Sequence, residues 1–149
     1  QRLYLLQNRH ILASYSVSTS RHGTGNRAGS HKTPLGVHRI AERIGDGCQA
    51  GEIITARKPT GRLAAVVSEP RSAGQDMITT RILWLEGLEP GINRGMGVDS
   101  YERYIYIHGT PEEGLIGQPA SIGCIRMKNA DVIELFNAVD EGTLVQILK

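Results

Sequence analysis

The chain has 149 residues, 40 % of them hydrophobic, and a formal net charge of +2 at pH 7. This length fits one domain with a sizeable core, so we expect a single domain over residues 1–149. The small net charge and the few aromatic residues, one Trp, five Tyr and one Phe, argue against a nucleic-acid partner. No stretch reaches the roughly 18 apolar residues of a membrane span.

The first part of the chain predicts a series of short strands. Residues 3–6 and 11–18 are apolar segments that flank Gln7-Asn8-Arg9-His10, the pattern of a β-hairpin. Further segments rich in β-branched and aliphatic residues alternate with Gly, Pro and Asn clusters; they are 37–42, 53–56, 78–85 and 103–108. The chain opens directly on a strand pattern with no export signal, so we expect upstream residues to be missing from its N-terminus.

One helix is predicted near the C-terminus, over residues 130–141. Asn129 is the expected N-cap, and Asp131 suits the positive end of the helix dipole. The apolar residues follow a helical period; they are Val132, Leu135, Phe136 and Val139. Gly142 is expected to end the helix before a last strand over 143–148. The fold class predicted is mainly β, or β-rich α+β: a sandwich or barrel with one main helix.

The strongest chemical signal is Cys124, which follows His108 by 16 positions. A free thiol with a pKa of about 8.5 is only about 3 % ionised at pH 7. An imidazolium partner that lowers this pKa raises the reactive fraction, roughly thirtyfold at most. The pair therefore predicts a thiol nucleophile and its base.

The neighbours of Cys124 suit acyl chemistry. Gly123 has no Cβ, so a substrate carbonyl can approach its backbone, and the N–H groups of Gly123 and Cys124 can face an oxyanion. If this segment is extended, Arg126 projects from the same face as Cys124 about 7 Å away. Such a guanidinium suits a substrate carboxylate. Strand alternation also places Tyr104, Tyr106 and His108 on one face, where the tyrosines either line the approach to the site or only pack.

Other interpretations of these residues stay open at the level of sequence. Cys124 alone is also typical of a small buried hydrophobic residue, and Cys48 is available as a disulfide partner. A zinc site is disfavoured because no second Cys or His lies at ligand spacing. The remaining histidines have no partner motif and are expected at the surface; they are His10, His22, His31 and His38.

The chain resembles the L,D-transpeptidase catalytic domain of the YkuD type. The likeness rests on His108-Gly109 and on the run from Ser121 to Arg126, Ser-Ile-Gly-Cys-Ile-Arg. Residues 1–5 resemble the opening strand of that family, 32–37 its Thr-Pro-x-Gly turn, and 129–131 the start of the helix after the catalytic strand. One departure is Ile122, where many relatives carry a second His. The base implied is the upstream His108.

The resemblance implies an enzyme that cross-links peptidoglycan stem peptides through a Cys124 thioester. It implies that the Gly109 carbonyl orients His108 and that Ser121 steadies the turn or bonds to His108. The strand geometry described above, not the resemblance, indicates Arg126 and Tyr106 as substrate-binding residues. No metal or organic cofactor is implied. Carbapenem β-lactams are the inhibitors expected, and the location implied is periplasmic or otherwise extracytoplasmic, facing the cell wall.

Two rival functions remain at this stage. A hydrolase of the same fold, an L,D-carboxypeptidase or a lipoprotein-releasing amidase, would use the same residues with water as the acceptor. A non-catalytic module that binds the cell wall would have no need of Cys124 with His108 and Arg126 around it.

Overall fold

The computed structural model describes all residues, 1–149, as mostly strands with one helix. The elements are β1 (Arg2–Gln7), β2 (His10–Ser18), β3 (Gly36–Ile44), β4 (Glu52–Thr55), β5 (Lys58–Leu63), β6 (Ile78–Gly87), β7 (Tyr106–Gly109), a 3-10 turn (Glu113–Leu115), β8 (Ile125–Met127), α1 (Asn129–Ala138) and β9 (Leu144–Ile147). The predicted β-rich class with one main helix is confirmed.

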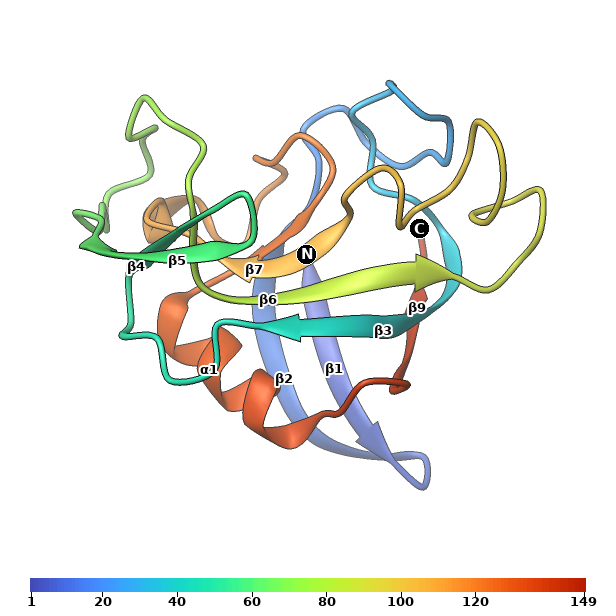
Figure 1. Cartoon of the computed structure of the whole chain (residues 1–149), viewed down its shortest axis with the longest axis horizontal. Coiled ribbons are helices and arrows are strands. Elements are labelled where there is room, and N and C mark those ends of the chain that lie inside the picture. Colours follow the sequence, from blue (N-terminus) through green and yellow to red (C-terminus); the bar gives the residue numbers. More distant parts are fainter.

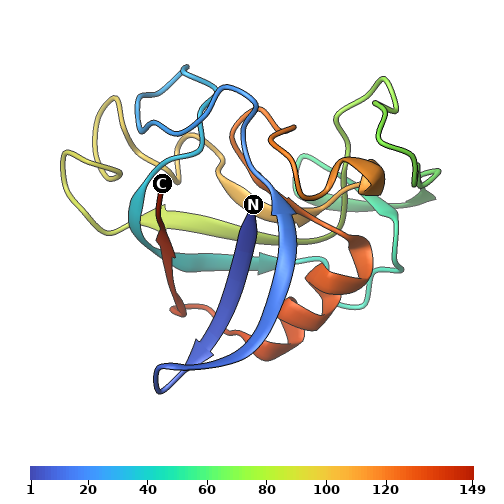
Figure 2. The ribbon, with the colours of Figure 1, turned by 180° about the vertical axis from the view of Figure 1, so that it is seen from behind.

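The strands form one curled sheet in the order β1-β2-β8-β7-β6-β3-β9, and the β4–β5 hairpin joins it through β6. All pairs are antiparallel except β7 with β8, which run parallel. The curl turns β1 and β2 across the direction of β3 and β6 (Figure 1). Seen from behind, α1 lies beside β2 in the hollow of the sheet (Figure 2).

The predicted hairpin at the N-terminus is confirmed, and its turn has a clear backbone cause. Asn8 and Arg9 both have positive φ, 48° and 67°, which is the conformation of a two-residue type I′ turn. The strand predicted over 103–108 begins only at Tyr106, because Tyr104 has φ 55° and cannot continue an extended chain. Strand β5 was not predicted, because all of its residues except Leu63 are polar or turn-forming, and all are exposed.

The helix is shorter than predicted, and its cap is a different residue. Helix α1 ends at Ala138 with Val139 as its C-cap, so Gly142 does not end it and lies instead in the turn before β9. The N-cap is Lys128, whose side chain makes no capping hydrogen bond. Asn129 is the first helical residue and is buried. The cap prediction was wrong because tertiary partners occupy the Asn129 side chain.

The sheet has two unequal apolar sides. The larger core joins the α1 residues Val132, Leu135 and Phe136 to buried residues of β2, β6, β7 and β8. The smaller cluster, which includes Trp84 and Tyr106, lies apart from it and has Cys124 packed against it. Alternation along β7 sends Ile107 to the first cluster and Tyr106 to the second, as predicted. The candidate site lies on the side of the smaller cluster.

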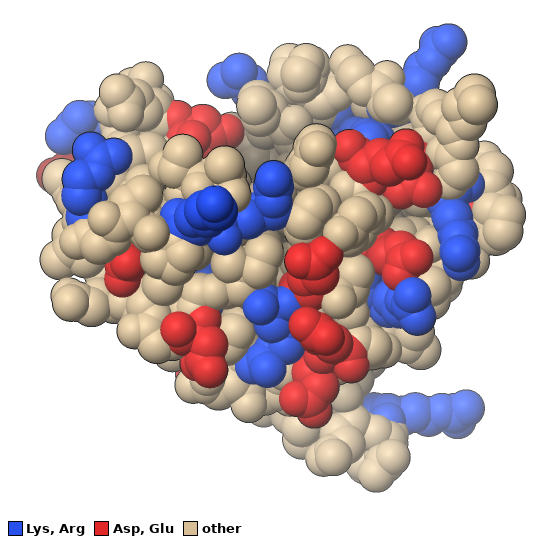
Figure 3. All heavy atoms as spheres, in the orientation of Figure 1, with Lys and Arg blue, Asp and Glu red and all other residues tan.

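Charge and polarity at the surface agree with the composition. Acidic and basic side chains are interspersed on the face shown in Figure 3, without a field of one sign. No helix has the length and apolarity required to cross a bilayer. His38 corrects an expectation: it is fully buried, with Nε2 2.9 Å from Ser100 Oγ and Nδ1 3.0 Å from Gly36 O. No sequence motif indicated that His38 is buried, because its partner Ser100 lies 62 residues away in the chain.

Candidate active site

Strands β7 and β8 bring the two predicted chemical residues to one pocket. His108 lies on β7 opposite Arg126 of β8, and Cys124 lies in the bend just before β8. The pocket has a volume of about 200 Å³. Its lining residues are Asp76, Ile78, Tyr104, Tyr106, His108, Ser121, Ile122, Cys124 and Arg126.

The Cys124 sulfur makes two hydrogen bonds with the backbone that leads into β7. The Tyr106 N–H donates to Sγ at 3.3 Å, and the thiol donates to the Tyr104 carbonyl at 3.3 Å. The positive φ of Tyr104 belongs to the turn that presents this carbonyl. The resting thiol therefore makes its hydrogen bonds with these backbone groups and none with His108.

The His108 ring is oriented by its own strand. Its Nδ1 lies 2.7 Å from the Gly109 carbonyl oxygen, so Nδ1–H is the donor and Nε2 is left as the acceptor. A Cβ at Gly109 would lie 2.6 Å from Thr79 O and 2.8 Å from Asn129 Oδ1, so only glycine fits there. The Asn129 amide also donates a hydrogen bond to Thr110 O at 3.0 Å, just after Gly109 in the chain.

Burial sets the protonation of both groups. Burial raises the pKa of the Cys124 thiol to about 11; the Tyr106 N–H and the charges of Arg126 and Arg103 act against this rise, and Asp76 adds to it. Burial likewise lowers the pKa of His108 to about 4, against the opposing effect of the Gly109 carbonyl. The sequence predicted a thiol pKa lowered by an imidazolium. That expectation was wrong for the resting protein, which holds a neutral thiol and a neutral imidazole at pH 7.

The turn before Cys124 is closed by Ser121. The Gly123 N–H donates to Ser121 Oγ at 3.2 Å, and the Ser121 hydroxyl donates to the Cys124 carbonyl at 2.6 Å. Ser121 therefore steadies the turn and makes no bond to His108. Because Ser121 occupies the Gly123 N–H, the expected pair of oxyanion donors is reduced to the Cys124 N–H, which donates no hydrogen bond. Gly123 itself has φ 138°, a conformation that side chains disfavour.

Arg126 is buried and already bound to two carboxylates of the protein. Its Nη1 lies 2.8 Å from Glu112 Oε2 and its Nη2 lies 2.7 Å from Asp76 Oδ1. Glu112 also accepts from Ser72 Oγ and the Ala73 N–H, at 2.8 and 2.7 Å, which fixes the segment before β6. The expected contact between Arg126 and a substrate carboxylate stays a prediction, and both terminal nitrogens are occupied in the resting site.

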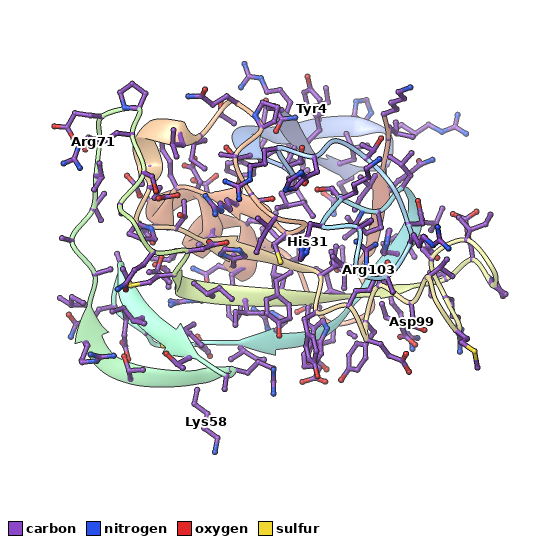
Figure 4. All side chains as sticks on the ribbon, turned by 90° about the horizontal axis from the view of Figure 1, so that it is seen from above. Tyr4, His31, Lys58, Arg71, Asp99 and Arg103 are labelled. Atoms are coloured by element: carbon purple, nitrogen blue, oxygen red, sulfur yellow. The ribbon has the colours of Figure 1, made fainter.

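Two tyrosines of the pocket lining, Tyr104 and Tyr106, contact residues that are not part of that lining, Trp84 and Arg57. The Trp84 ring meets that of Tyr106 edge to face at 5.4 Å and that of Tyr104 at 5.5 Å. The Arg57 guanidinium, at the tip of the β4–β5 hairpin, lies 5.2 Å from the Trp84 ring and 5.3 Å from the Tyr104 ring. The next residue, Lys58, points away from the body of the molecule (Figure 4).

Sequence reasoning missed Asp76, Glu112 and Arg57. Asp76 and Glu112 lie 50 and 14 residues from Arg126 in the chain, at no motif spacing. Arg57 lies in a hairpin whose second strand was not predicted. The only available signal was a requirement of physical chemistry, that a buried arginine needs carboxylate partners.

The alternative uses of the cysteines can be compared with the structure. Both Cys48 and Cys124 are free thiols. No group of three or more His, Cys, Asp or Glu side chains is arranged to hold a metal ion.

Comparison with known proteins gives curated matches that are high in identity but short. "Putative L,D-transpeptidase YkuD" of Bacillus subtilis (strain 168) is 56 % identical over 41 residues, which are 28 % of this chain and 25 % of that protein. The match thus spans about a quarter of the curated relative.

Solved structures share the fold at low identity. An L,D-transpeptidase from Mycobacterium smegmatis superposes with a TM-score of 0.53 at 14 % identity, over 93 % of this chain and 50 % of that one. L,D-transpeptidase 3 from Mycobacterium tuberculosis, solved in complex with a faropenem-derived adduct, gives 0.51 at 17 %, over 91 % of this chain and 45 % of that one. The chain therefore spans about half of these proteins.

The family model covers nearly the whole chain. The model of the L,D-transpeptidase catalytic domain named YkuD matches residues 1–147. The fold described above is that of the solved L,D-transpeptidases. The chain belongs to the YkuD family of L,D-transpeptidase catalytic domains.

Proposed function

We propose that this protein is a cysteine acyltransferase that cross-links peptidoglycan stem peptides through a thioester on Cys124. The observation that carries the proposal is the placement of Cys124 Sγ and the His108 ring in one pocket, with His108 held by the Gly109 carbonyl. The substrate comes from membership of the family. The residues alone support acyl transfer by a thiol.

The first half-reaction begins from the neutral pair. As a substrate binds, the thiol turns from the Tyr104 carbonyl toward His108, and Nε2 takes its proton while Sγ attacks the carbonyl carbon. The carbonyl belongs to the L-centre of a diamino acid next to a terminal D-amino acid. Since the pKa of Cys124 is about 11 and that of His108 about 4, proton transfer accompanies the attack rather than preceding it.

The tetrahedral intermediate then collapses to the thioester. Its oxyanion is held by the free Cys124 N–H, and Gly123 leaves room for it. The C–N bond breaks, His108 returns its proton to the leaving amine, and the D-amino acid departs. An amine from a second stem attacks the thioester, His108 takes a proton from that amine, and the new amide forms as the Cys124 thiol is restored. Such a reaction places the protein at the cell wall, outside the cytoplasm.

The products formed from purified muropeptides test this function directly. Mass spectrometry should detect cross-linked dimers with the wild-type protein and with Cys48→Ala, and none with Cys124→Ala. Shortened monomers without dimers would mean that water is the acceptor and the protein a hydrolase. Unchanged muropeptides would exclude both reactions and favour a binding module.

A further inference from the structure

Arg57 is a cation that contacts two tyrosines of the pocket lining, Tyr104 and Tyr106, and has no carboxylate partner within ion-pair distance. The structure contains four ion pairs, and Arg57 belongs to none of them. Its side chain is exposed, and its nearest polar partner is the Tyr106 hydroxyl, 3.5 Å from Nη1. The N–H donors of a guanidinium lie in its own plane. When its face contacts aromatic rings, these donors remain free to bind an anion. Arg57 is therefore available to a ligand.

Tyr106 connects this cation with the nucleophile. The backbone N–H of Tyr106 donates to Cys124 Sγ at 3.3 Å, and the hydroxyl at the other end of the same residue meets Arg57. Tyr104 makes a second connection, because its carbonyl accepts from Sγ and its ring lies under the Arg57 guanidinium. The cation thus lies one tyrosine side chain away from the sulfur.

The hairpin presents Arg57 in a defined position. Ala56 and Arg57 have φ values of 47° and 65°, and Thr55 pairs with Lys58, which makes a two-residue type I′ turn. The rings of Trp84 and Tyr104 then restrict where the guanidinium lies. Fewer side-chain conformations are lost when a preorganised arginine binds an anion.

Arg126, the arginine that lines the pocket, is less accessible to a substrate carboxylate than Arg57. Its two terminal nitrogens are bound to Glu112 and Asp76, and its side chain is almost fully buried. A substrate carboxylate would have to displace an internal one to reach it. Arg57 requires no such exchange.

We propose that Arg57 binds a free carboxylate of the peptide substrate next to the bond that Cys124 attacks. The inference rests on the proposed function and specifies which group of the substrate is recognised. Two carboxylates are possible sources: the C-terminus of the leaving D-amino acid, and a second carboxylate on the diamino acid where it carries one.

Binding measured without turnover tests the inference. Cys124→Ala serves as the background, and calorimetry gives Kd for a stem tetrapeptide ending in D-alanine and for the same peptide with one or the other carboxylate converted to an amide. Amidation of the recognised carboxylate should weaken binding about tenfold, as expected for loss of a charged hydrogen bond. Adding Arg57→Ala should weaken the free acid by the same factor and remove the difference between acid and amide.

Neighbouring variants serve as controls. Lys58→Ala removes an equal charge from the same hairpin, but its side chain points away (Figure 4), so the preference for the acid should remain. Arg57→Lys should restore only part of the preference, because an ammonium has no planar fork.

The outcomes separate this inference from the proposed function. If Arg57→Ala retains the full acid preference, Arg57 does not bind the carboxylate, although the peptide is still a ligand. If Cys124→Ala binds none of the peptides, the proposed substrate is wrong, and the inference is overturned with it.

Discussion

Two arginines, Arg126 in the lining of the Cys124 pocket and Arg57 beside two of its tyrosines, have opposite charge environments. Arg126 is buried between Glu112 and Asp76, so a single cation meets two carboxylates. Arg57 is exposed over aromatic rings and meets none. The carboxylates of the protein already bind Arg126, whereas Arg57 is available to a ligand.

This difference bears on how the thiol is kept unreactive at rest. The carboxylate of Asp76 raises the pKa of Cys124, while the Arg126 and Arg103 charges lower it, and burial exceeds them all. Burial of the sulfur therefore keeps the proton on Cys124 at rest, and the Asp76 carboxylate adds to this effect.

Removing the base should have the largest effect. His108→Ala should lower kcat/KM by about 10² to 10⁴, the contribution expected of a general base. In the wild type, the plateau of kcat/KM should extend down to about pH 4 and up toward about pH 11, the pKa values of His108 and Cys124. Steady-state kinetics with muropeptides provides both readouts. Unchanged kinetics in His108→Ala, with the exposed His22→Ala as the control, would show that the base is misassigned.

Breaking the ion pair between Arg126 and Glu112 should cost stability. Glu112→Gln leaves the buried Arg126 with only Asp76, and we expect a loss of about 3 kcal/mol in the free energy of unfolding. Glu69→Gln, which removes an exposed partner of Arg71 at 3.9 Å, should cost less than about 1 kcal/mol. Urea denaturation at pH 7 measures both.

The pH dependence of Glu112→Gln checks the same ion pair. Burial disfavours the charge of Glu112, but the Ala73 and Ser72 hydrogen bonds and Arg126 outweigh it and lower its pKa. A lowered carboxyl pKa contributes stability above its ordinary value of 4.5, and this contribution disappears as the pH falls through the lowered value. The gap between wild type and Glu112→Gln should therefore narrow below pH 4.5. A constant gap from pH 7 to pH 3 would contradict the ion pair.

Asp76→Asn should make the thiol easier to ionise. Removing this carboxylate removes an effect that raises the pKa of Cys124, so the alkylation rate with iodoacetamide should rise at a lower pH than in the wild type. Asp140→Asn replaces an exposed carboxylate that does not line the pocket and is the matched control. A profile shifted to higher pH in Asp76→Asn would mean that the carboxylate acts on the thiol in another way.

The smallest effect is expected at the departure from the family pattern. Ile122 lines the pocket with 46 % of its surface exposed, and Ile122→His should change kcat/KM by no more than about twofold. The reason is that the Gly109 carbonyl already orients His108 as the base. The double variant His108→Ala with Ile122→His provides the decisive comparison. If its activity exceeds that of His108→Ala, a histidine at position 122 can act as the base.

Local sequence patterns predicted the parts of the fold and site that depend on near neighbours. The hairpin at Asn8-Arg9, the apolar stripe of α1 and the alternation along β7 follow from spacing alone. The contact between His108 and the Gly109 carbonyl joins adjacent residues, and it was expected from the resemblance to the family rather than from spacing.

Contacts between distant residues were beyond such patterns. Asn129 has the composition of an N-cap, yet its Oδ1 accepts from Thr79 Oγ1 at 2.6 Å, 50 residues away, and this partner overrides capping. Likewise, the spacing of Cys124 and Arg126 indicated a substrate contact, whereas the carboxylates that occupy Arg126 come from other segments. Burial, which determines the direction of the pKa shifts of Cys124 and His108, is a property of the assembled pocket.

The most direct test of the central claim is the intact mass of the protein after exposure to a carbapenem. We predict a single acyl adduct on the wild type, the same adduct on Cys48→Ala, and none on Cys124→Ala, because the proposed nucleophile is Cys124. An adduct that persists in Cys124→Ala would contradict this prediction.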